Sequence, residues 1–110
     1  MGKGRSEHLH GALELLILRS LAVDSMHGWG ISKYIQKVSE GLLEVNQGSL
    51  YPALYRLEDR GWIASEWGLA ATGRRAKVYH LTKVGKKQLG KEDSEWSAFS
   101  LAVNRILGQA

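Results

Sequence analysis

The spacing of apolar residues changes along the chain and predicts the order of its helices and strands. Leucine and isoleucine dominate residues 11–22, where Glu14, Arg19 and Ser20 are the polar positions, and this predicts a first helix buried on most sides. A second, amphipathic helix that ends near Gly41 is predicted by apolar residues spaced i, i+3, i+4 and i+7. These residues are Ile31, Tyr34, Ile35 and Val38.

A third helix is predicted from Ser49 to Arg60, after turn-forming residues at 46–48. Ser49 suits the N-cap of this helix, and Gly61 suits its C-terminal cap. Pro52 is tolerated because backbone amides of the first turn lack partners within the helix. The inward face is apolar, and the outward positions are Tyr51, Tyr55, Arg56 and Asp59. Two exposed tyrosines beside an arginine indicate a binding surface.

After Gly61 the apolar spacing changes from the period of a helix to that of a strand. Residues 62–67 and 75–81 are rich in aromatic and β-branched residues, and a loop at 68–73 joins them, which predicts a projecting β-hairpin. Basic residues gather where the second strand leaves the loop, at Arg74, Arg75 and Lys77. This patch favours contact with nucleic acid, and an ordinary solvated turn is the alternative.

A last helix is predicted from Thr82, a suitable N-cap, to about Leu107. It would be ~39 Å long at about 1.5 Å per residue, more than a small domain covers with its own core. Its apolar residues form a heptad-like seam that Glu92 interrupts, made of Leu89, Trp96, Phe99, Val103 and Ile106. A two-fold homodimer would bury this seam. The alternative is that the helix folds back to close its own domain.

Composition narrows the classes of function. The chain has 110 residues, 44% of them hydrophobic, which suits one compact domain. A net charge of +4 and a pI near 9.5 favour polyanionic partners such as nucleic acid or an acidic lipid surface. Cysteine is absent, which excludes disulfides and thiolate zinc sites. No apolar run has the length of a signal peptide or membrane span, so we expect a cytoplasmic protein without membrane contact.

Catalysis has little support in the sequence. No pairing of serine, histidine and aspartate is evident, and the neighbouring carboxylates Glu92 and Asp93 lie on a predicted solvent-facing helix. His8, His10 and His27 are weak candidates for a metal site, because histidines in loops without other ligands are usually bystanders. We therefore expect no enzymatic activity, no cofactor and no metal.

Several segments resemble the PadR family of transcriptional regulators, in family order over roughly residues 10–90. They are residues 13–18 (LELLIL), 26–31 (MHGWGI), 48–54 (GSLYPAL), 56–58 (RLE), 61–63 (GWI), 74–77 (RRAK) and 79–82 (YHLT). Trp29 stands where the family often has tyrosine, and the chain is similar to the short branch of the family, with one terminal helix. The resemblance implies an α+β, mostly α fold. A winged helix-turn-helix with a two-stranded β wing would occupy residues 9–81, and a long C-terminal dimerisation helix residues 82–108.

The resemblance also implies that the third helix enters the major groove of duplex DNA and that the wing lies over the adjacent backbone or minor groove. The implied DNA contacts are Gln47, Ser49, Tyr51, Pro52, Tyr55 and Arg56, with Arg74, Arg75 and Lys77 on the wing and Lys33 on the second helix. For Arg56 we expect a phosphate contact, and a guanine contact or an intrahelical pair with Asp59 are alternatives. Tyr51 has the alternative of a half-buried packing role.

As a member of this family the chain would be a homodimeric repressor that binds a pseudo-palindromic operator and is released by a small aromatic effector. Trp96 and Phe99 are the candidates to contact that effector, and packing of the dimer seam is the alternative role for both. Two other functions stay open. One is a winged-helix module that binds protein, whose binding would show no salt dependence of the DNA type. The other is a protein that sequesters a ligand without binding specific DNA.

Overall fold

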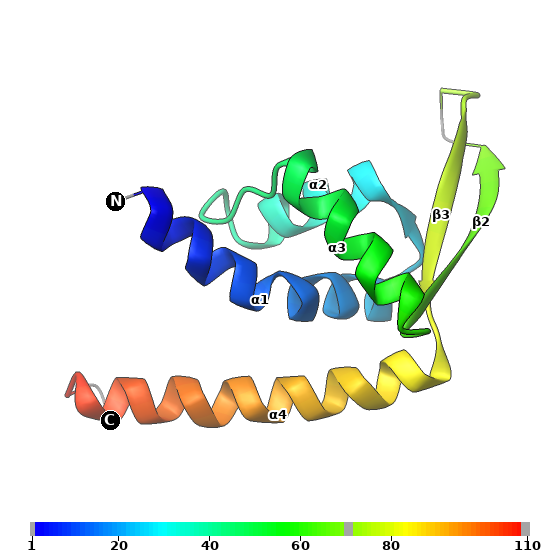
Figure 1. The fold of residues 1–110 in the computed structure, drawn as a ribbon. Coiled ribbons are helices and arrows are strands. Elements are labelled where there is room, and N and C mark those ends of the chain that lie inside the picture. The colour runs from blue at the N-terminus through cyan, green and yellow to red at the C-terminus, as the bar shows by residue number, and fades with distance from the viewer. Residues whose placement is uncertain (1, 70–71, 109–110) are drawn as a thin grey trace.

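We describe residues 2–69 and 72–108 of the computed structural model, with side chains from residue 12 onward. The elements follow one another as α1 (Gly2–Val23), β1 (Met26–His27), α2 (Gly28–Val38), α3 (Gln47–Asp59), β2 (Ile63–Leu69), β3 (Arg75–Leu81) and α4 (Lys83–Ile106). Figure 1 shows α1, α2 and α3 packed together, with β2 and β3 projecting from one end and α4 running back beneath α1. The predicted mostly helical fold with a wing and a long terminal helix is confirmed.

The core lies where α1, α2 and α3 meet the base of the sheet. Its buried apolar residues are Leu13, Ile17, Leu18, Leu21, Ile31, Ile35, Leu50, Ala53, Leu54, Leu57, Ile63, Tyr79 and Leu89. On α3 the buried positions recur at three- and four-residue spacing, so one face of that helix is inside and the opposite face is free. Helix α1 begins at Gly2 rather than near residue 11, because the apolar pattern that located it covers its C-terminal half alone.

The sheet has three antiparallel strands in the order β1-β3-β2. The predicted hairpin forms the wing, in which Trp67 pairs with Lys77 and Leu69 with Arg75. Strand β1 was not predicted, since it is two residues long and too short to show an alternating pattern. Its pairing of Met26 with Tyr79 ties the start of α2 to the base of the wing.

Helix α3 begins and ends with side-chain and backbone caps. Its N-cap is Asn46, whose side chain accepts a hydrogen bond from the Ser49 backbone amide at 2.9 Å, so the prediction of Ser49 as the cap is wrong by three residues. Gly61 adopts a φ of +79° after the last turn. The Trp62 amide then donates to the Leu57 carbonyl at 3.0 Å, which confirms the glycine cap and turns the chain directly into β2.

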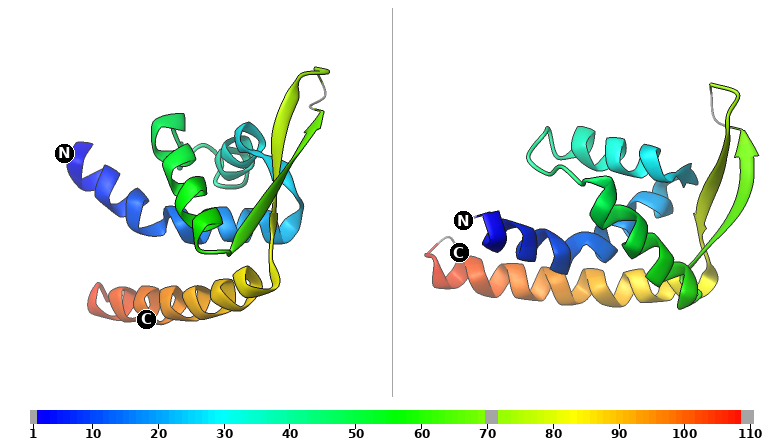
Figure 2. Two further views of the ribbon diagram at one scale, coloured as in Figure 1. Left: turned by 45° about the vertical axis from the view of Figure 1, so that its right-hand side comes forward. Right: turned by 45° about the horizontal axis from the view of Figure 1, so that its top comes forward.

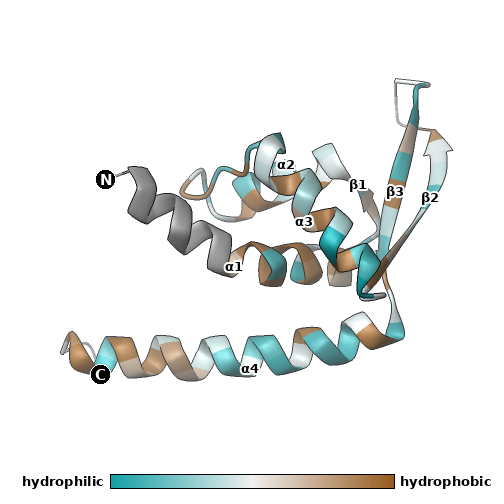
Figure 3. Ribbon diagram, viewed as in Figure 1, coloured by the Kyte–Doolittle hydropathy of each residue, from teal (hydrophilic) through white to brown (hydrophobic). Residues whose placement is uncertain are grey.

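Helix α4 has the predicted N-cap, because the Thr82 hydroxyl accepts a hydrogen bond from the Gly85 amide at 3.0 Å. The helix runs antiparallel to α1 in all views (Figures 1 and 2). Leu89, assigned to the dimer seam from the sequence, is instead 8% exposed in the core of its own chain. The C-terminal turns of α4 are rich in hydrophobic residues, drawn brown in Figure 3, and Trp96, Phe99 and Ile106 among them are exposed. No helix within the described ranges has the length and hydropathy to cross a membrane.

Candidate nucleic-acid interface

The free face of α3 carries four of the six α3 residues that the sequence assigned to DNA contact. Gln47, Tyr51 and Tyr55 are spaced four residues apart and form one exposed stripe, in which Tyr55 is 74% exposed. Pro52 is also exposed beside the stripe, and Ser49 is half-buried. Because the opposite face is fixed in the core, this stripe is held rigidly in the orientation in which it meets solvent.

Arg56 lies on a different side of α3 from the exposed stripe. Its Nε donates to Glu14 Oε2 of α1 at 3.3 Å, and Arg60 Nη1 donates to the other carboxylate oxygen, Oε1, at 2.8 Å. The side chain of Arg56 is 39% exposed. The structure therefore pairs Arg56 with α1 rather than with Asp59, and Glu14 clamps the last turns of α3 to α1 through two arginines.

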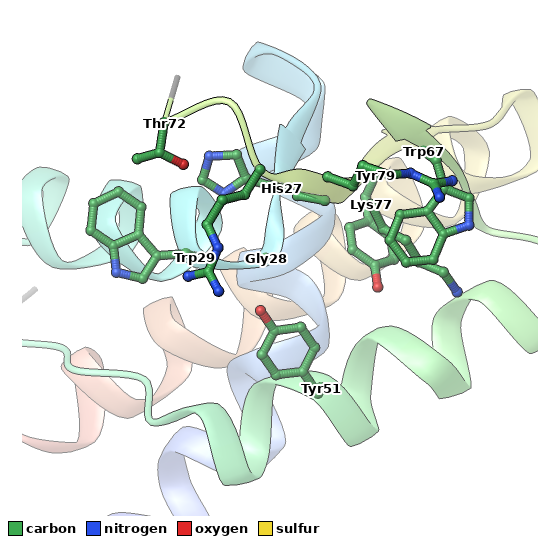
Figure 4. A pocket seen from close by; sticks show the side chains of 11 residues that line it. His27, Gly28, Trp29, Tyr51, Trp67, Thr72, Lys77 and Tyr79 are labelled. Carbon is green, nitrogen blue, oxygen red and sulfur yellow. The ribbon is translucent and has the colours of Figure 1, made fainter. Parts of the chain in front are cut away.

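A groove of about 740 Å³ opens between the start of α2, the first turn of α3 and the wing (Figure 4). We call it the wing groove. Its lining residues are His27, Gly28, Trp29, Tyr51, Trp67, Thr72, Arg74, Arg75, Ala76, Lys77 and Tyr79. It brings together Tyr51 and the three wing cations that the sequence singled out, whereas Lys33, Gln47, Ser49, Pro52, Tyr55 and Arg56 lie outside its lining.

Trp67 holds two of these cations over its ring. The Arg75 guanidinium lies 5.0 Å and the Lys77 ammonium 5.8 Å from the ring centroid, both within the range of a cation–π interaction. Cross-strand pairing places Lys77 directly opposite Trp67, on the same face of the hairpin. Sequence reasoning missed Trp67, although a two-residue period carried across the hairpin aligns it with the basic positions.

The opposite wall of the groove is built around Trp29. Its ring stacks on His27 with centroids 6.0 Å apart, and the Lys33 ammonium lies 5.1 Å from the Trp29 ring. His27 itself caps α2, because its Nδ1 accepts a hydrogen bond from the Gly30 amide at 3.0 Å. His27 thus has a structural role, and the side chains of His8 and His10 lie outside the described residues. Within the described residues, no group of three potential metal ligands comes together.

Tyr51 has the packing role that the sequence left as an alternative, and its DNA contact stays a prediction. Its ring packs so closely on the start of α2 that a Cβ at Gly28 would lie 2.7 Å from the Tyr51 hydroxyl oxygen, yet Tyr51 remains 44% exposed. Tyr79, which also lines the groove, is 6% exposed. Burial raises the pKa of the Tyr79 hydroxyl, and the nearby Glu58 and Tyr51 raise this pKa further. The formally charged side chains of the groove lining, Arg74, Arg75 and Lys77, all come from the wing.

We compared the sequence with protein families and with known proteins, and it matches one family. Residues 17–91 match the family described as transcriptional regulator PadR-like. The transcriptional regulator Rv3488 of Mycobacterium tuberculosis is 34% identical over 86 residues, which cover 78% of this chain and 77% of that protein.

Solved structures agree with this family match. A PadR-like transcriptional regulator of Bacillus cereus superimposes with a TM-score of 0.79 at 30% identity, covering 92% of this chain and 96% of the other. A transcriptional regulator of Clostridium thermocellum superimposes with a TM-score of 0.81 at 28% identity, covering 90% and 96%.

Proposed function

Because the chain belongs to the PadR-like family of transcriptional regulators, we propose that it represses transcription as a homodimer that grips duplex DNA with α3 and the wing. Membership of this family makes the protein a transcription factor rather than an enzyme. The observation that carries the proposal is the continuity of two surfaces, namely the exposed stripe of α3 and the wing groove with its cations. Tyr51 belongs to both surfaces.

The geometry supports different roles for α3, which would contact bases, and for the surrounding cations, which would contact phosphates. An α-helix fits the major groove, where the free edge formed by Gln47, Tyr51, Pro52 and Tyr55 would meet base edges and nearby phosphates. Arg74, Arg75 and Lys77 line the wing groove, and Lys33 lies over the Trp29 ring. These cations would contact phosphates of the adjacent backbone. We assign Arg56 the role of orienting α3 against α1, because its Nε is paired with Glu14 of α1.

The exposed apolar side chains of α4 are the reason for proposing a dimer. Past Leu89 its apolar side chains are exposed, with Trp96 at 47%, Phe99 at 61% and Ile106 at 84%, while Val103 is half-buried. Burial of such a row against a second copy is worth about 25 cal/mol per Å² of apolar surface removed from water. A two-fold pair of chains presents two copies of α3, which explains why the operator would be pseudo-palindromic.

Repression and its release follow from the same arrangement. A dimer bound across a promoter excludes other proteins from that DNA. The Trp96 and Phe99 rings lie 5.9 Å apart on α4. An aromatic effector inserted at this pair would change the dimer geometry if it binds one arrangement of the two copies better than the other.

The test is a fluorescence-anisotropy titration with the duplex upstream of the protein's own gene and a scrambled duplex, each at low and near-physiological salt. We expect preference for the upstream duplex to persist at higher salt. Tyr55→Ala should reduce that preference. Lys77→Gln should weaken binding to both duplexes and lower the slope of log affinity against log salt by about one.

Three other outcomes would contradict parts of this proposal. Equal, salt-sensitive binding to both duplexes would show that the protein does not recognise a specific sequence in the upstream duplex. Absence of binding at either salt would favour a module that binds protein through the same surface. Tight retention of an aromatic ligand that is indifferent to DNA would favour a sequestering protein.

A further inference from the structure

Helix α3 and the wing are joined by a hydrogen bond between two side chains. Glu58, in the last turn of α3, accepts from the Ser65 hydroxyl of β2, with 2.6 Å between Oε2 and Oγ. This distance is typical of a hydroxyl that donates to a charged carboxylate, which is the stronger class of hydrogen bond. Within the described residues, it is the only side-chain hydrogen bond from β2 or β3 to another element.

Ser65 lies near the base of the wing, on the face that carries the cations. It pairs across the hairpin with Tyr79, which is buried in the core. The two-residue period of a strand places Trp67 on the same face as Ser65, and the partner of Trp67 across the hairpin is Lys77. The hydrogen bond to Glu58 therefore holds the wing by the face that would contact phosphates.

A small change of angle at Ser65 would move the tip of the wing a long way. Leu69, at the end of β2, lies four residues further on, which is about 13 Å at ~3.3 Å per residue. A tilt of about 10° at Ser65 would move the tip by about 2 Å over that length. Hydrogen bonds to phosphate need about 2.7–3.2 Å between nitrogen and oxygen, so a shift of this size is enough to break them.

The charge of Glu58 argues against a direct contact with DNA, because a carboxylate repels phosphate. The side chain is half-buried, and its Oε2 is taken up by Ser65. Burial raises the pKa of the Tyr79 hydroxyl, and the Glu58 carboxylate raises this pKa further, so Glu58 also lies near Tyr79 of β3. Glu58 thus connects the helix that would read bases with both strands of the wing.

We propose that Glu58 is a positioning residue for DNA binding, which holds the wing at the angle where its cations meet phosphates while α3 meets the adjacent bases. The inference rests on the proposed function, because the angle matters for binding only if α3 and the wing contact one duplex. It makes an anionic side chain necessary for affinity toward an anionic ligand. Charge alone predicts the opposite.

The first test compares Glu58→Ala with Glu66→Ala in the anisotropy titration. Each change removes one negative charge, and Glu66 is exposed on the opposite face of β2 from Ser65. Through charge alone, both variants would bind the upstream duplex more tightly. We expect Glu58→Ala instead to weaken this binding about tenfold and to lower the salt slope by about one to two, as if one or two wing cations were lost. Tighter binding by both variants would overturn the proposal.

Conservative variants test the hydrogen bond itself. Glu58→Gln keeps an oxygen that can accept from Ser65, and Ser65→Thr keeps the hydroxyl, so both should retain most of the affinity for the upstream duplex. Ser65→Ala removes the donor and should reproduce the loss caused by Glu58→Ala. If Ser65→Ala binds like the unchanged chain, the hydrogen bond has no part in placing the wing.

A double-mutant cycle with Lys77 gives a readout that a loss of stability does not move. Lys77→Gln should weaken binding clearly in the unchanged chain and much less in the Glu58→Ala chain, because the displaced wing no longer brings Lys77 to the duplex. Urea denaturation shows whether each variant is folded under the conditions of the titration. Additive effects in folded variants would contradict the proposal.

The angle of the wing can also be measured without DNA. The chain has no cysteine, so Val23→Cys on α1 and Leu69→Cys on the wing, both at exposed positions, give two specific sites for spin labels. The labelled chain is diluted into unlabelled chain, so that distances within one copy dominate the measurement. Ser65→Ala should broaden the distribution of distances between the two labels, and Ser65→Thr should not.

These outcomes separate the inference from the proposed function. A broadened distribution in a protein that binds no duplex would refute the proposed function and leave Glu58 as the residue that sets the angle of the wing. Tight binding of the upstream duplex together with an unchanged distribution would refute the positioning role and leave the DNA-binding function in place.

Discussion

Glu14 of α1 is paired with two arginines at the C-terminal end of α3, the helix that we propose reads DNA. Its two carboxylate oxygens accept from Arg56, in the last turn of α3, and from Arg60, the C-cap residue four positions further on. All three side chains are partly exposed, so solvent screens the attraction. The pairing therefore contributes more to the direction of α3 than to the free energy of folding.

We predict that Glu14→Gln lowers the free energy of unfolding by at most about 1 kcal/mol, because exposed ion pairs are weak. Urea denaturation measures this change, and Glu95→Gln on the exposed side of α4 is the control. The substitution should nevertheless alter sequence preference in the anisotropy titration, since α3 loses its clamp. A loss of several kcal/mol would show that the clamp supports the core itself.

The buried hydroxyl of Tyr79, at the base of the wing, makes the stability of the fold depend on pH in the alkaline range. Its folded pKa is raised above the usual value of 10.0, first by burial and then by Glu58 and Tyr51. A raised folded pKa stabilises the native state below the unfolded pKa, and that stability is lost as pH rises through the folded pKa. We predict that the melting temperature falls above about pH 10 and that Tyr79→Phe reduces this fall. Tyr55→Phe, at an exposed position, should not reduce it.

At the scale of an element, two glycines of α4 have opposite roles. Gly85 lies where the helix passes against the chain before β2, and a Cβ there would collide with the Trp62 carbonyl oxygen. Gly90 has open space around it. Both residues are helical, so the difference between them comes from packing alone.

We predict that Gly85→Ala lowers the free energy of unfolding by about 2–3 kcal/mol, through overpacking against backbone that cannot move aside. Gly90→Ala should raise it by about 0.5–1 kcal/mol, since alanine is the better helix former. Urea denaturation of both variants gives a direct comparison. Equal effects of the two substitutions would contradict the close approach of α4 to Trp62.

Elements with strong periodicity were predictable from the sequence, and contacts between distant residues were not. The spacing of apolar residues located α2, α3 and the hairpin, and Thr82 marked the start of α4 correctly. The cap of α3 was misplaced because Asn46 and Ser49 are both good caps, and which one is used depends on the path of the preceding loop. Strand β1 is too short for any period to reveal.

The candidate site shows the same limit. Tyr51 and the wing cations were identified from local pattern, and the groove does bring them together. The pair of Arg56 with Glu14 joins residues 42 positions apart, so no local pattern predicts it. In the sequence, Trp29 was noted only for its resemblance to a family position. Its place in the groove depends on the pairing of β1 with the sheet, which no local pattern predicts.

At the scale of the whole molecule, α4 leaves a row of apolar side chains exposed on one face of the protein. The molecule measures 50 × 31 × 21 Å along its principal axes, and α4 spans much of its length (Figures 1 and 2). Leu89 joins the core, whereas Trp96 and Phe99 stay open although they continue the same apolar row. The helix folds back along α1 and closes the chain's own core at Leu89, as one of the two alternatives drawn from the sequence expects. The other alternative, a dimer that buries the exposed row, stays a prediction.

We predict that Trp96→Asp gives monomers in sedimentation velocity, because a charge in the seam would be desolvated without a partner of opposite sign. Ser97→Asp is the control, since at about 100° per residue it lies on the side of α4 away from the seam and should leave the dimer intact. A monomer carries a single copy of α3, so Trp96→Asp should also weaken operator binding far more than binding to a duplex with one half-site. A stable dimer with aspartate at this position would place the interface elsewhere, and the two recognition helices would then need a different spacing on DNA.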